Sequence, residues 1–189
     1  MSGLSPAARL LLRPFRGYAE LAAEEEAPTI LGGAALLLFA LGAFVSFTAA
    51  GRLVPLDLAL AFGAFAYVPL VQAVALGAAT RLVARDVPFR RAFALYLAGH
   101  GPYVLLFFVV EGVCLFAPEP AGALLAVAPP LALGIFAWGA LLTFACFRAG
   151  VGLDRRRAAA ATGIFYASST ACVLGYFLAA GQLWPILPR

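Results

Sequence analysis

Polar side chains occur at one common depth in three long apolar segments of the chain. Gln72, His100 and Tyr166 each lie nine residues from an arginine that borders their own segment. At about 1.5 Å per helical residue, all three would sit about 13–14 Å beyond the arginine level, and Ser168 and Ser169 would lie nearby. Lipid tails offer no hydrogen bonds, so polar groups at this depth face the interior of a helix bundle. The spacing therefore predicts an inner polar layer of these five residues.

This layer has two main interpretations. In the first, it provides hydrogen bonds between helices, worth about 0.6–2 kcal/mol per contact. In the second, it binds a ligand or carries a proton. His100 is the only histidine of the chain and has no second ligand beside it, so neither metal nor haem ligation is expected, and no cofactor is predicted. The three cysteines lie far apart in apolar runs and are expected to be free thiols.

A second polar cluster is expected near the opposite membrane surface. Glu111 follows His100 by eleven residues, which returns it to nearly the same helix face about 16 Å further along. Arg52 and Asp57 should lie near the same surface. One expectation is an ion pair between Glu111 and Arg52, and the other is a small polar vestibule lined by the two carboxylates.

The composition identifies the class of protein. Of the 189 residues, 64% are hydrophobic and 12% are charged, and the mean hydropathy is +0.98. Soluble domains carry about 25% charged residues, so this chain has too few polar side chains to cover a surface in water. All thirteen basic residues are arginine, and because they border apolar segments we expect no nucleic-acid partner.

Five apolar segments are long enough for a transmembrane helix of about 20 residues. Short connections should make consecutive helices antiparallel neighbours. The predicted fold is therefore all-α, a polytopic membrane helix bundle with a cytoplasmic N-terminal segment, one transmembrane domain and a short external tail. The N-terminal segment covers residues 1–27, the transmembrane domain 28–183 and the tail 184–189. The five spans cover about 28–51, 54–80, 92–117, 121–147 and 158–183.

The segment before the first span is predicted to form an amphipathic interfacial helix. Arg9, Arg13 and Arg16 recur at helical spacing, with apolar residues on another face. Pro14 either kinks this helix or starts its second part. In the headgroup layer, the three arginines would meet anionic lipid while the apolar face enters the acyl boundary. The alternative is a helix packed on the cytoplasmic face of the protein itself.

The distribution of arginine predicts the orientation. Eleven of the thirteen arginines border the spans on the N-terminal side of the membrane, and two lie on the other side. Positively charged residues are concentrated in cytoplasmic loops, which places the N-terminus in the cytoplasm. Five spans then place the C-terminus outside. We expect a multi-pass protein of the cytoplasmic (inner) membrane of a bacterium.

Three stretches give the chain a resemblance to a known family. They are LLLRPFRGYAELAAEE at 10–25, VPFRRAFALYLAGHGPYVL at 87–105, and the fourth and fifth spans with the arginine-rich turn between them. This layout resembles the Yip1 family of five-span integral membrane proteins, especially its bacterial members. The resemblance implies a five-helix membrane fold and implies no reaction.

Two functional hypotheses follow, and neither is an enzyme. The sequence has no Walker motif and no HExxH, and an intramembrane enzyme would have one histidine and few carboxylates for acid–base work. The first hypothesis is a non-enzymatic protein that organises protein partners or lipids in the cytoplasmic membrane. Its expected partners are anionic lipids at the cytoplasmic face and either other proteins or further copies of itself. The alternative is a small permease or transporter subunit with an intramembrane polar site around His100.

Overall fold

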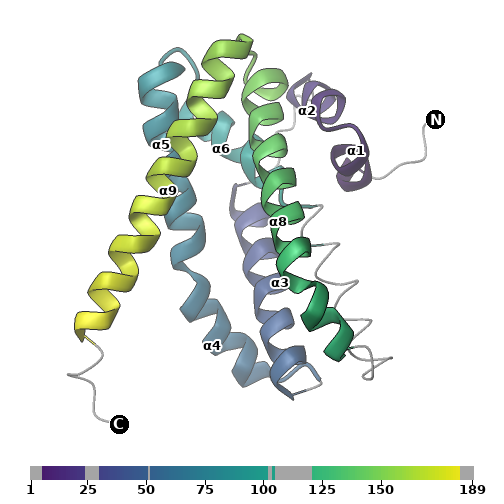
Figure 1. Ribbon diagram of the computed structural model, residues 1–189. Coiled ribbons are helices and arrows are strands. Elements are labelled where there is room, and N and C mark those ends of the chain that lie inside the picture. The colour runs from purple at the N-terminus through teal and green to yellow at the C-terminus, as the bar shows by residue number, and fades with distance from the viewer. Residues whose placement is uncertain (1–5, 24–29, 51, 102–103, 105–120, 184–189) are drawn as a thin grey trace.

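The computed structural model describes residues 6–23, 30–50, 52–101, 104 and 121–183. Over these ranges the chain is helical and contains no strand. Figure 1 shows the helices arranged as an elongated bundle with two short helices at one end. The elements are α1 (Pro6–Leu12), α2 (Pro14–Ala23), α3 (Ile30–Ala50), α4 (Pro55–Phe65), α5 (Tyr67–Val83), α6 (Phe89–Ala98), α8 (Ala121–Ala145), a π-helical turn η1 (Cys146–Gly150) and α9 (Arg155–Leu183).

Three helical segments of the described chain are long and apolar enough to cross a membrane. They are Pro55–Val83, Leu133–Gly150 and Arg155–Tyr176, and Gly32–Phe44 within α3 is a shorter apolar stretch. The all-helical fold and the membrane-like character of the helices are thereby confirmed. Most of the predicted third span, 92–117, lies outside the described residues, as does the tail.

Proline explains why the predicted second span is two helices. Pro69 has no backbone N–H, so the carbonyl of Phe65, four residues earlier, receives no helical hydrogen bond. The helix α4 ends at Phe65, and α5 begins at Tyr67. Pro14 acts differently, because α1 ends at Leu12 and Pro14 is the first residue of α2. Pro14 therefore starts the second part of the N-terminal helical segment, which is the second of the two roles predicted for it.

The helix α9 begins three residues before the predicted boundary at 158, and Asp154 is the reason. Its Oδ1 atom accepts hydrogen bonds from the backbone N–H groups of Arg156 and Arg157, at 2.9 and 3.0 Å. An aspartate in this position satisfies two N–H groups that have no partner within the helix, which is the role of an N-cap.

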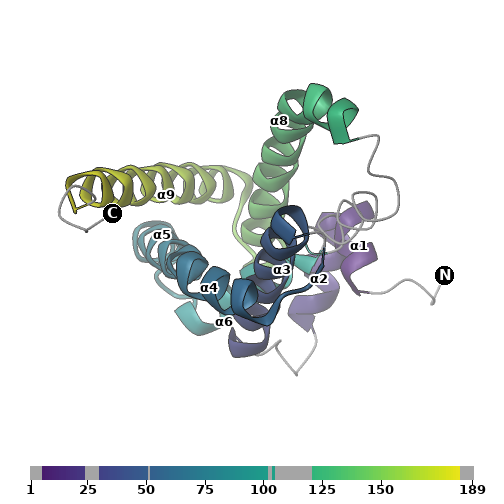
Figure 2. The same cartoon turned by 90° about the horizontal axis from the view of Figure 1, so that it is seen from below.

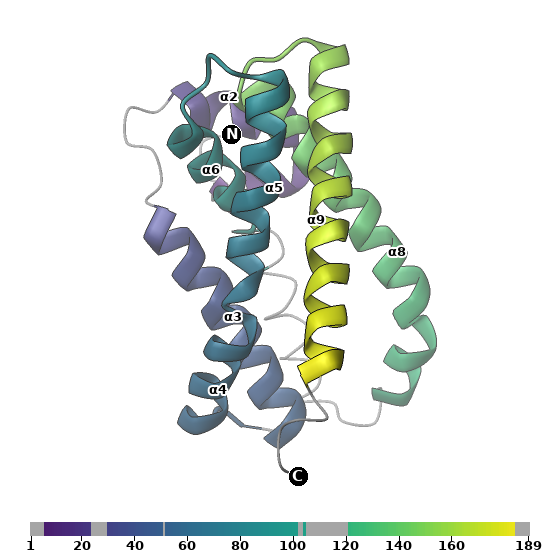
Figure 3. The same cartoon turned by 90° about the vertical axis from the view of Figure 1, so that its left-hand side faces the viewer.

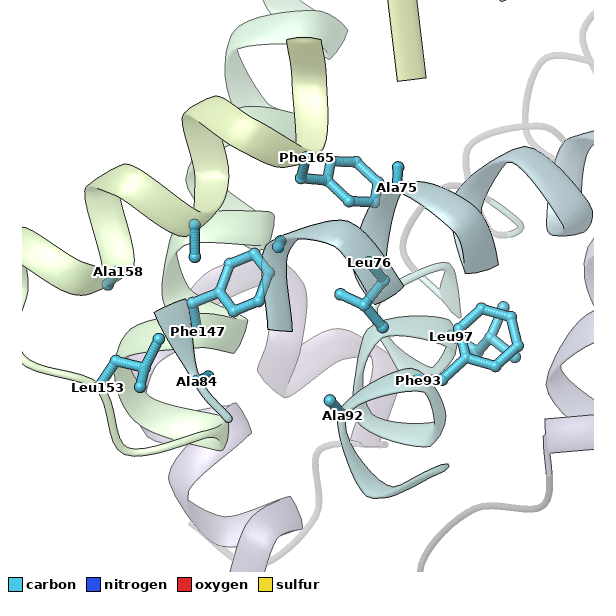
Figure 4. Packing of buried hydrophobic residues seen from close by; sticks show 12 residues of the cluster. Ala75, Leu76, Ala84, Ala92, Phe93, Leu97, Phe147, Leu153, Ala158 and Phe165 are labelled. Carbon is cyan, nitrogen blue, oxygen red and sulfur yellow. The ribbon is translucent and has the colours of Figure 1, made fainter. Parts of the chain in front are cut away.

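The larger of two buried hydrophobic clusters in the described chain joins α5, α6, η1 and α9. Leu76 of α5, Phe147 of η1 and Phe165 of α9 lie together in this cluster (Figure 4) and are almost completely buried. The helices α5 and α9 run side by side (Figure 3). Buried alanines on both helices allow the two backbones to approach closely, as small residues do in membrane helix pairs. These are Ala75 and Ala79 on α5 and Ala158 and Ala161 on α9.

The long helices are close together at one end and diverge toward the other. The π-helical turn η1 and the short connection after it join α8 to α9, and from there the two helices splay apart (Figures 1 and 2). At the joined end, α2 packs against η1 and α8. This arrangement places α2 at the end of the bundle.

The N-terminal helices both pack on the protein and expose an apolar edge. Leu10 and Tyr18 are buried against α6, α8 and η1. Leu12 is 64% exposed and Phe15 41% exposed. One face of the N-terminal segment therefore contacts the bundle, as the alternative interpretation predicted, and another face is open to the surroundings.

The eleven arginines of the predicted cytoplasmic side gather at this same end of the molecule. They belong to α1 and α2, to the connection between α5 and α6, and to η1 and the start of α9, which together form the upper part of Figure 1. Arg52 lies in the turn between α3 and α4 at the opposite end. Nearly all arginines of the described chain thus lie at one end of the bundle axis.

Candidate functional site

A cavity of about 320 Å³ lies in the space between the helices. Its wall is mostly apolar, with contributions from α3, α4, α5 and α8. Six side chains with polar groups on the wall come from five helices and from the turn that follows α6. They are Tyr18, Gln72, Tyr96, His100, Thr143 and Tyr166.

Three of the five residues of the predicted polar layer meet at this cavity. Gln72, His100 and Tyr166 line it together, although they come from three separate helical segments. Ser168 and Ser169 are half-buried on α9 and are not among its lining residues. The hydroxyl of Ser169 is buried without a hydrogen-bond partner in the described chain. The sequence therefore predicts that Gln72, His100 and Tyr166 lie at one level. It does not predict the direction in which the side chains of the two serines point.

Gln72 and His100 form a direct contact across two elements. Their Nε2 atoms are 3.0 Å apart, and the Nδ1 atom of His100 is 3.2 Å from the backbone carbonyl oxygen of Leu97. A carbonyl can only accept, so Nδ1 carries the proton. Nε2 of the neutral ring is then the acceptor for the side-chain amide of Gln72. This contact ties α5 to the turn that follows α6.

His100 lies at a break in the helix that was predicted to be continuous over 92–117. The helix α6 ends at Ala98, Gly99 and His100 form a turn, and helical backbone resumes at Gly101. Glycine has little preference for helical backbone, which favours a break in this segment. Non-helical backbone is tolerated at membrane depth where it is buried in protein or lines a cavity, and both Gly99 and His100 line this one.

Tyr166 is positioned by a threonine that was not predicted. Its hydroxyl is 3.5 Å from Oγ1 of Thr143, whose own hydroxyl donates to the carbonyl of Gly139 at 2.9 Å. The proton of Thr143 is thereby used within α8, so Tyr166 is the donor in the contact between them. A signal was available in the sequence, because Thr143 is the only hydroxyl-bearing residue in segment 121–147.

Tyr18 reaches the cavity from the N-terminal helix α2. Its side chain is 1% exposed, and two glycines make room for it. A Cβ atom on Gly99 would overlap the Tyr18 hydroxyl, and one on Gly150 would lie 3.4 Å from its ring. The sequence places Tyr18 on the apolar face of an interfacial helix but contains no signal that the ring enters the bundle.

A second hollow, of about 260 Å³, also borders His100. It is bordered by the start of α3 and by the broken segment from Leu97 to Gly101. Gly33 packs closely here, since a Cβ on it would be 3.0 Å from that of Leu97. His100 borders both hollows, so one side chain contributes to the wall of each.

The predicted outer cluster is described only in part. Glu111 lies outside the described residues, so its ion pair with Arg52 is untested. Arg52 is exposed, Asp57 is half-buried in the first turn of α4, and no ion pair joins these two residues. Buried Ser46, which was not predicted, organises this end instead. Its hydroxyl donates to the carbonyl of Arg52 at 2.9 Å and accepts from the N–H of Val54 at 2.7 Å.

The predicted lipid-facing arginines are partly neutralised within the protein. Glu20 forms ion pairs with Arg9, at 3.1 Å, and with Arg16, at 2.7 Å. The hydrogen bond from Arg16 is the main reason that the pKa of the Glu20 carboxyl is below its ordinary value, with smaller effects from Arg9. Arg13, in the connection between α1 and α2, is exposed. It is therefore the arginine of the three that is best placed to meet an anionic headgroup.

The described lining of the cavity offers an amide, an imidazole and several hydroxyls within an apolar wall. In small-molecule sites, groups of this kind orient the bound molecule by hydrogen bonding, while an apolar wall supplies most of the contact area. Comparison of the chain with protein-family models, with curated proteins and with solved structures gave no match.

Proposed function

We propose that this chain is a non-enzymatic membrane protein that binds a small molecule in the cavity beside His100, as a small permease or a transporter subunit does. One observation carries the proposal. Gln72, His100 and Tyr166 converge from separate helices on a single cavity of about 320 Å³. Small-molecule sites commonly measure about 300–1,000 Å³ and combine an apolar wall with a few convergent polar groups.

The proposed membrane arrangement has five spans, with the arginine-rich end in the cytoplasm of a bacterium and the C-terminus outside. The three apolar helices and the gathering of eleven arginines at one end support this arrangement. Membership of the Yip1 family stays a proposal that rests on the three stretches of sequence quoted above.

A second candidate function is the organisation of lipids or protein partners at the cytoplasmic face. The observation that favours it is the exposed edge of the N-terminal helices, where Leu12 and Phe15 lie beside exposed Arg13. Apolar side chains next to arginine suit the boundary between headgroups and acyl chains. This function is compatible with ligand binding in the cavity, because the two use different surfaces.

Native mass spectrometry tests the binding function on protein extracted from its own membrane into lipid nanodiscs. We expect a small molecule to be retained by the wild type and to be reduced about tenfold in His100→Ala, which corresponds to about 1.4 kcal/mol of binding free energy. Tyr166→Phe should also reduce retention.

Tyr176→Phe provides the matched control. It makes the same chemical change on α9, but Tyr176 stacks on Tyr67 and is not among the described lining of the cavity. Circular dichroism should show equal helicity for all variants. Equal retention in wild type and His100→Ala would contradict the proposed function.

A further inference from the structure

We infer that the molecule held in this cavity is mostly apolar and carries a hydrogen-bond donor, such as a hydroxyl group, that binds the side-chain oxygen of Gln72. This inference rests on the proposed function, because it names the class of ligand for the same cavity.

The contact between His100 and Leu97 determines which ring nitrogen of His100 carries the proton. The carbonyl oxygen of Leu97 lies 3.2 Å from Nδ1, and it can only accept a hydrogen bond. The proton of the neutral imidazole is therefore on Nδ1, and Nε2 has a lone pair. None of the described lining residues is acidic, so no carboxylate stands in the wall to favour an imidazolium.

The position of the His100 proton in turn determines the orientation of the Gln72 amide. The group that faces Nε2 of His100 must donate, and the NH₂ of Gln72 does so at 3.0 Å. The reversed amide would place two acceptors against each other. Gln72 therefore has its nitrogen paired and its oxygen, Oε1, buried without a hydrogen-bond partner among the described residues. The large majority of buried side-chain polar atoms in proteins have a hydrogen-bond partner, so this acceptor calls for a donor.

The rest of the cavity wall is mostly apolar, and its volume limits the size of the ligand. Leu37, Val68, Phe136 and Leu142 contribute apolar surface to the wall that also contains Gln72. A volume of about 320 Å³ corresponds to roughly ten water-sized groups at about 30 Å³ each. The ligand that fits is a short apolar body with one donor, and a medium-length alcohol is the simplest probe of that class.

The experiment uses a diazirine-bearing octan-1-ol as a photolabel on the full chain in lipid nanodiscs, with the labelled residues mapped by mass spectrometry. Two competitors are compared at equal mole fraction in the lipid. Octan-1-ol has a donor, and its isomer 1-methoxyheptane has an oxygen but no donor. We expect labelling of residues of the cavity wall and about tenfold stronger competition by the alcohol. Gln72→Leu should keep the labelling and lose the preference for the alcohol.

Thr80→Val is the control variant on the same helix. Thr80 is buried, uses its hydroxyl within α5 and is not among the described lining residues, so this variant should keep the preference for the alcohol. The wild-type comparison needs no variant, so misfolding of Gln72→Leu leaves the test intact. Equal competition by alcohol and ether would overturn the donor inference and leave the proposed function standing. Absence of labelling in the cavity would contradict the proposed function itself.

Discussion

At the scale of single residues, Asp154 shows how one carboxylate fixes the start of a helix. The carboxyl accepts two backbone hydrogen bonds and lies 3.6 Å from the Nε atom of Arg157. The hydrogen bond from the backbone of Arg157, followed by that from Arg156, holds the pKa of Asp154 below its ordinary value. Asp154 lies at the arginine-rich end, just before the first turn of α9.

The lowered pKa predicts that the start of α9 frays in acid. A carboxylate with a lower pKa in the folded protein contributes stability above its unfolded pKa of about 3.9. That contribution is lost as the pH falls through the folded pKa. Hydrogen–deuterium exchange of residues 155–160, corrected for intrinsic rates, should show loss of protection in this range.

Two variants separate the charge of Asp154 from its capping role. Asp154→Asn keeps a capping oxygen and should abolish the acid dependence, because asparagine caps about as well as aspartate. Asp154→Ala should expose the first turn of α9 at every pH. An unchanged acid response in Asp154→Asn would show that another group is responsible.

Residue types could predict which side chains share a depth but not which way they face. Gln72, His100 and Tyr166 meet because equal distances from the arginines place them at one level. Ser168 follows Tyr166 by two residues, a rotation of about 200°, and so points to a different side of α9. Ser169 is about one turn further along the helix than Tyr166, which displaces it from the cavity.

At the scale of elements, the helix α2 closes the arginine-rich end of the cavity by inserting Tyr18. The ring is buried beside Cys146, Leu95 and Leu142, and it packs on a π-helical turn. Such turns hold one more residue than an α-helical turn and often occur at functional sites. The short helix thus takes part in the packing of the longer ones.

Removal of the Tyr18 ring should uncover Cys146. This thiol is fully buried in the native protein, whereas Cys172 is half-buried and serves as an internal reference. We expect Tyr18→Ala to increase the rate of modification of Cys146 by N-ethylmaleimide several-fold relative to Cys172. Mass spectrometry of the modified peptides measures both rates in one sample.

The matched variant Tyr18→Phe keeps the ring and should leave Cys146 protected. Equal modification rates of Cys146 in Tyr18→Ala and wild type would show that α2 does not cover the thiol. Loss of protection in Tyr18→Phe as well would instead assign the effect to the hydroxyl.

Helices and their boundaries could be predicted where residues close together in the sequence determine them. The apolar segments gave helices close to the expected positions, and Pro69 accounts for the boundary between α4 and α5. The turn η1 was not predicted, because it adjoins the inserted ring of Tyr18. The break at His100 adjoins the same ring, and Gly99 was the local signal that favours it. That insertion joins residues more than eighty positions apart, and no local pattern records it.

At the scale of the whole molecule, the separation of arginines along the bundle predicts its orientation in the membrane. Asp86 lies in the exposed turn between α5 and α6, and Leu53 is exposed in the turn between α3 and α4. In a variant without the native cysteines, Leu53→Cys should react with a membrane-impermeant maleimide on intact cells. Asp86→Cys should react only after permeabilisation.

The paired positions make this orientation test self-controlled. Arginine-rich loops remain in the cytoplasm, which is the reason for the expected pattern. Reaction of Asp86→Cys from outside, together with protection of Leu53→Cys, would reverse the proposed orientation. Reaction of both on intact cells would contradict the assignment of α3 to α5 as membrane helices.

For the proposed ligand, the exposed flank of the cavity predicts the phase from which it arrives. Phe136 belongs to the cavity wall, is 71% exposed and lies in an apolar helical segment that is long enough to span a bilayer. A molecule that enters past this ring comes sideways from the hydrocarbon layer, where an apolar compound is far more concentrated than in water. Occupancy then follows the amount of ligand per lipid, and dilution of the sample in buffer leaves it nearly unchanged. The proper dissociation constant for such a site is a mole fraction in the bilayer.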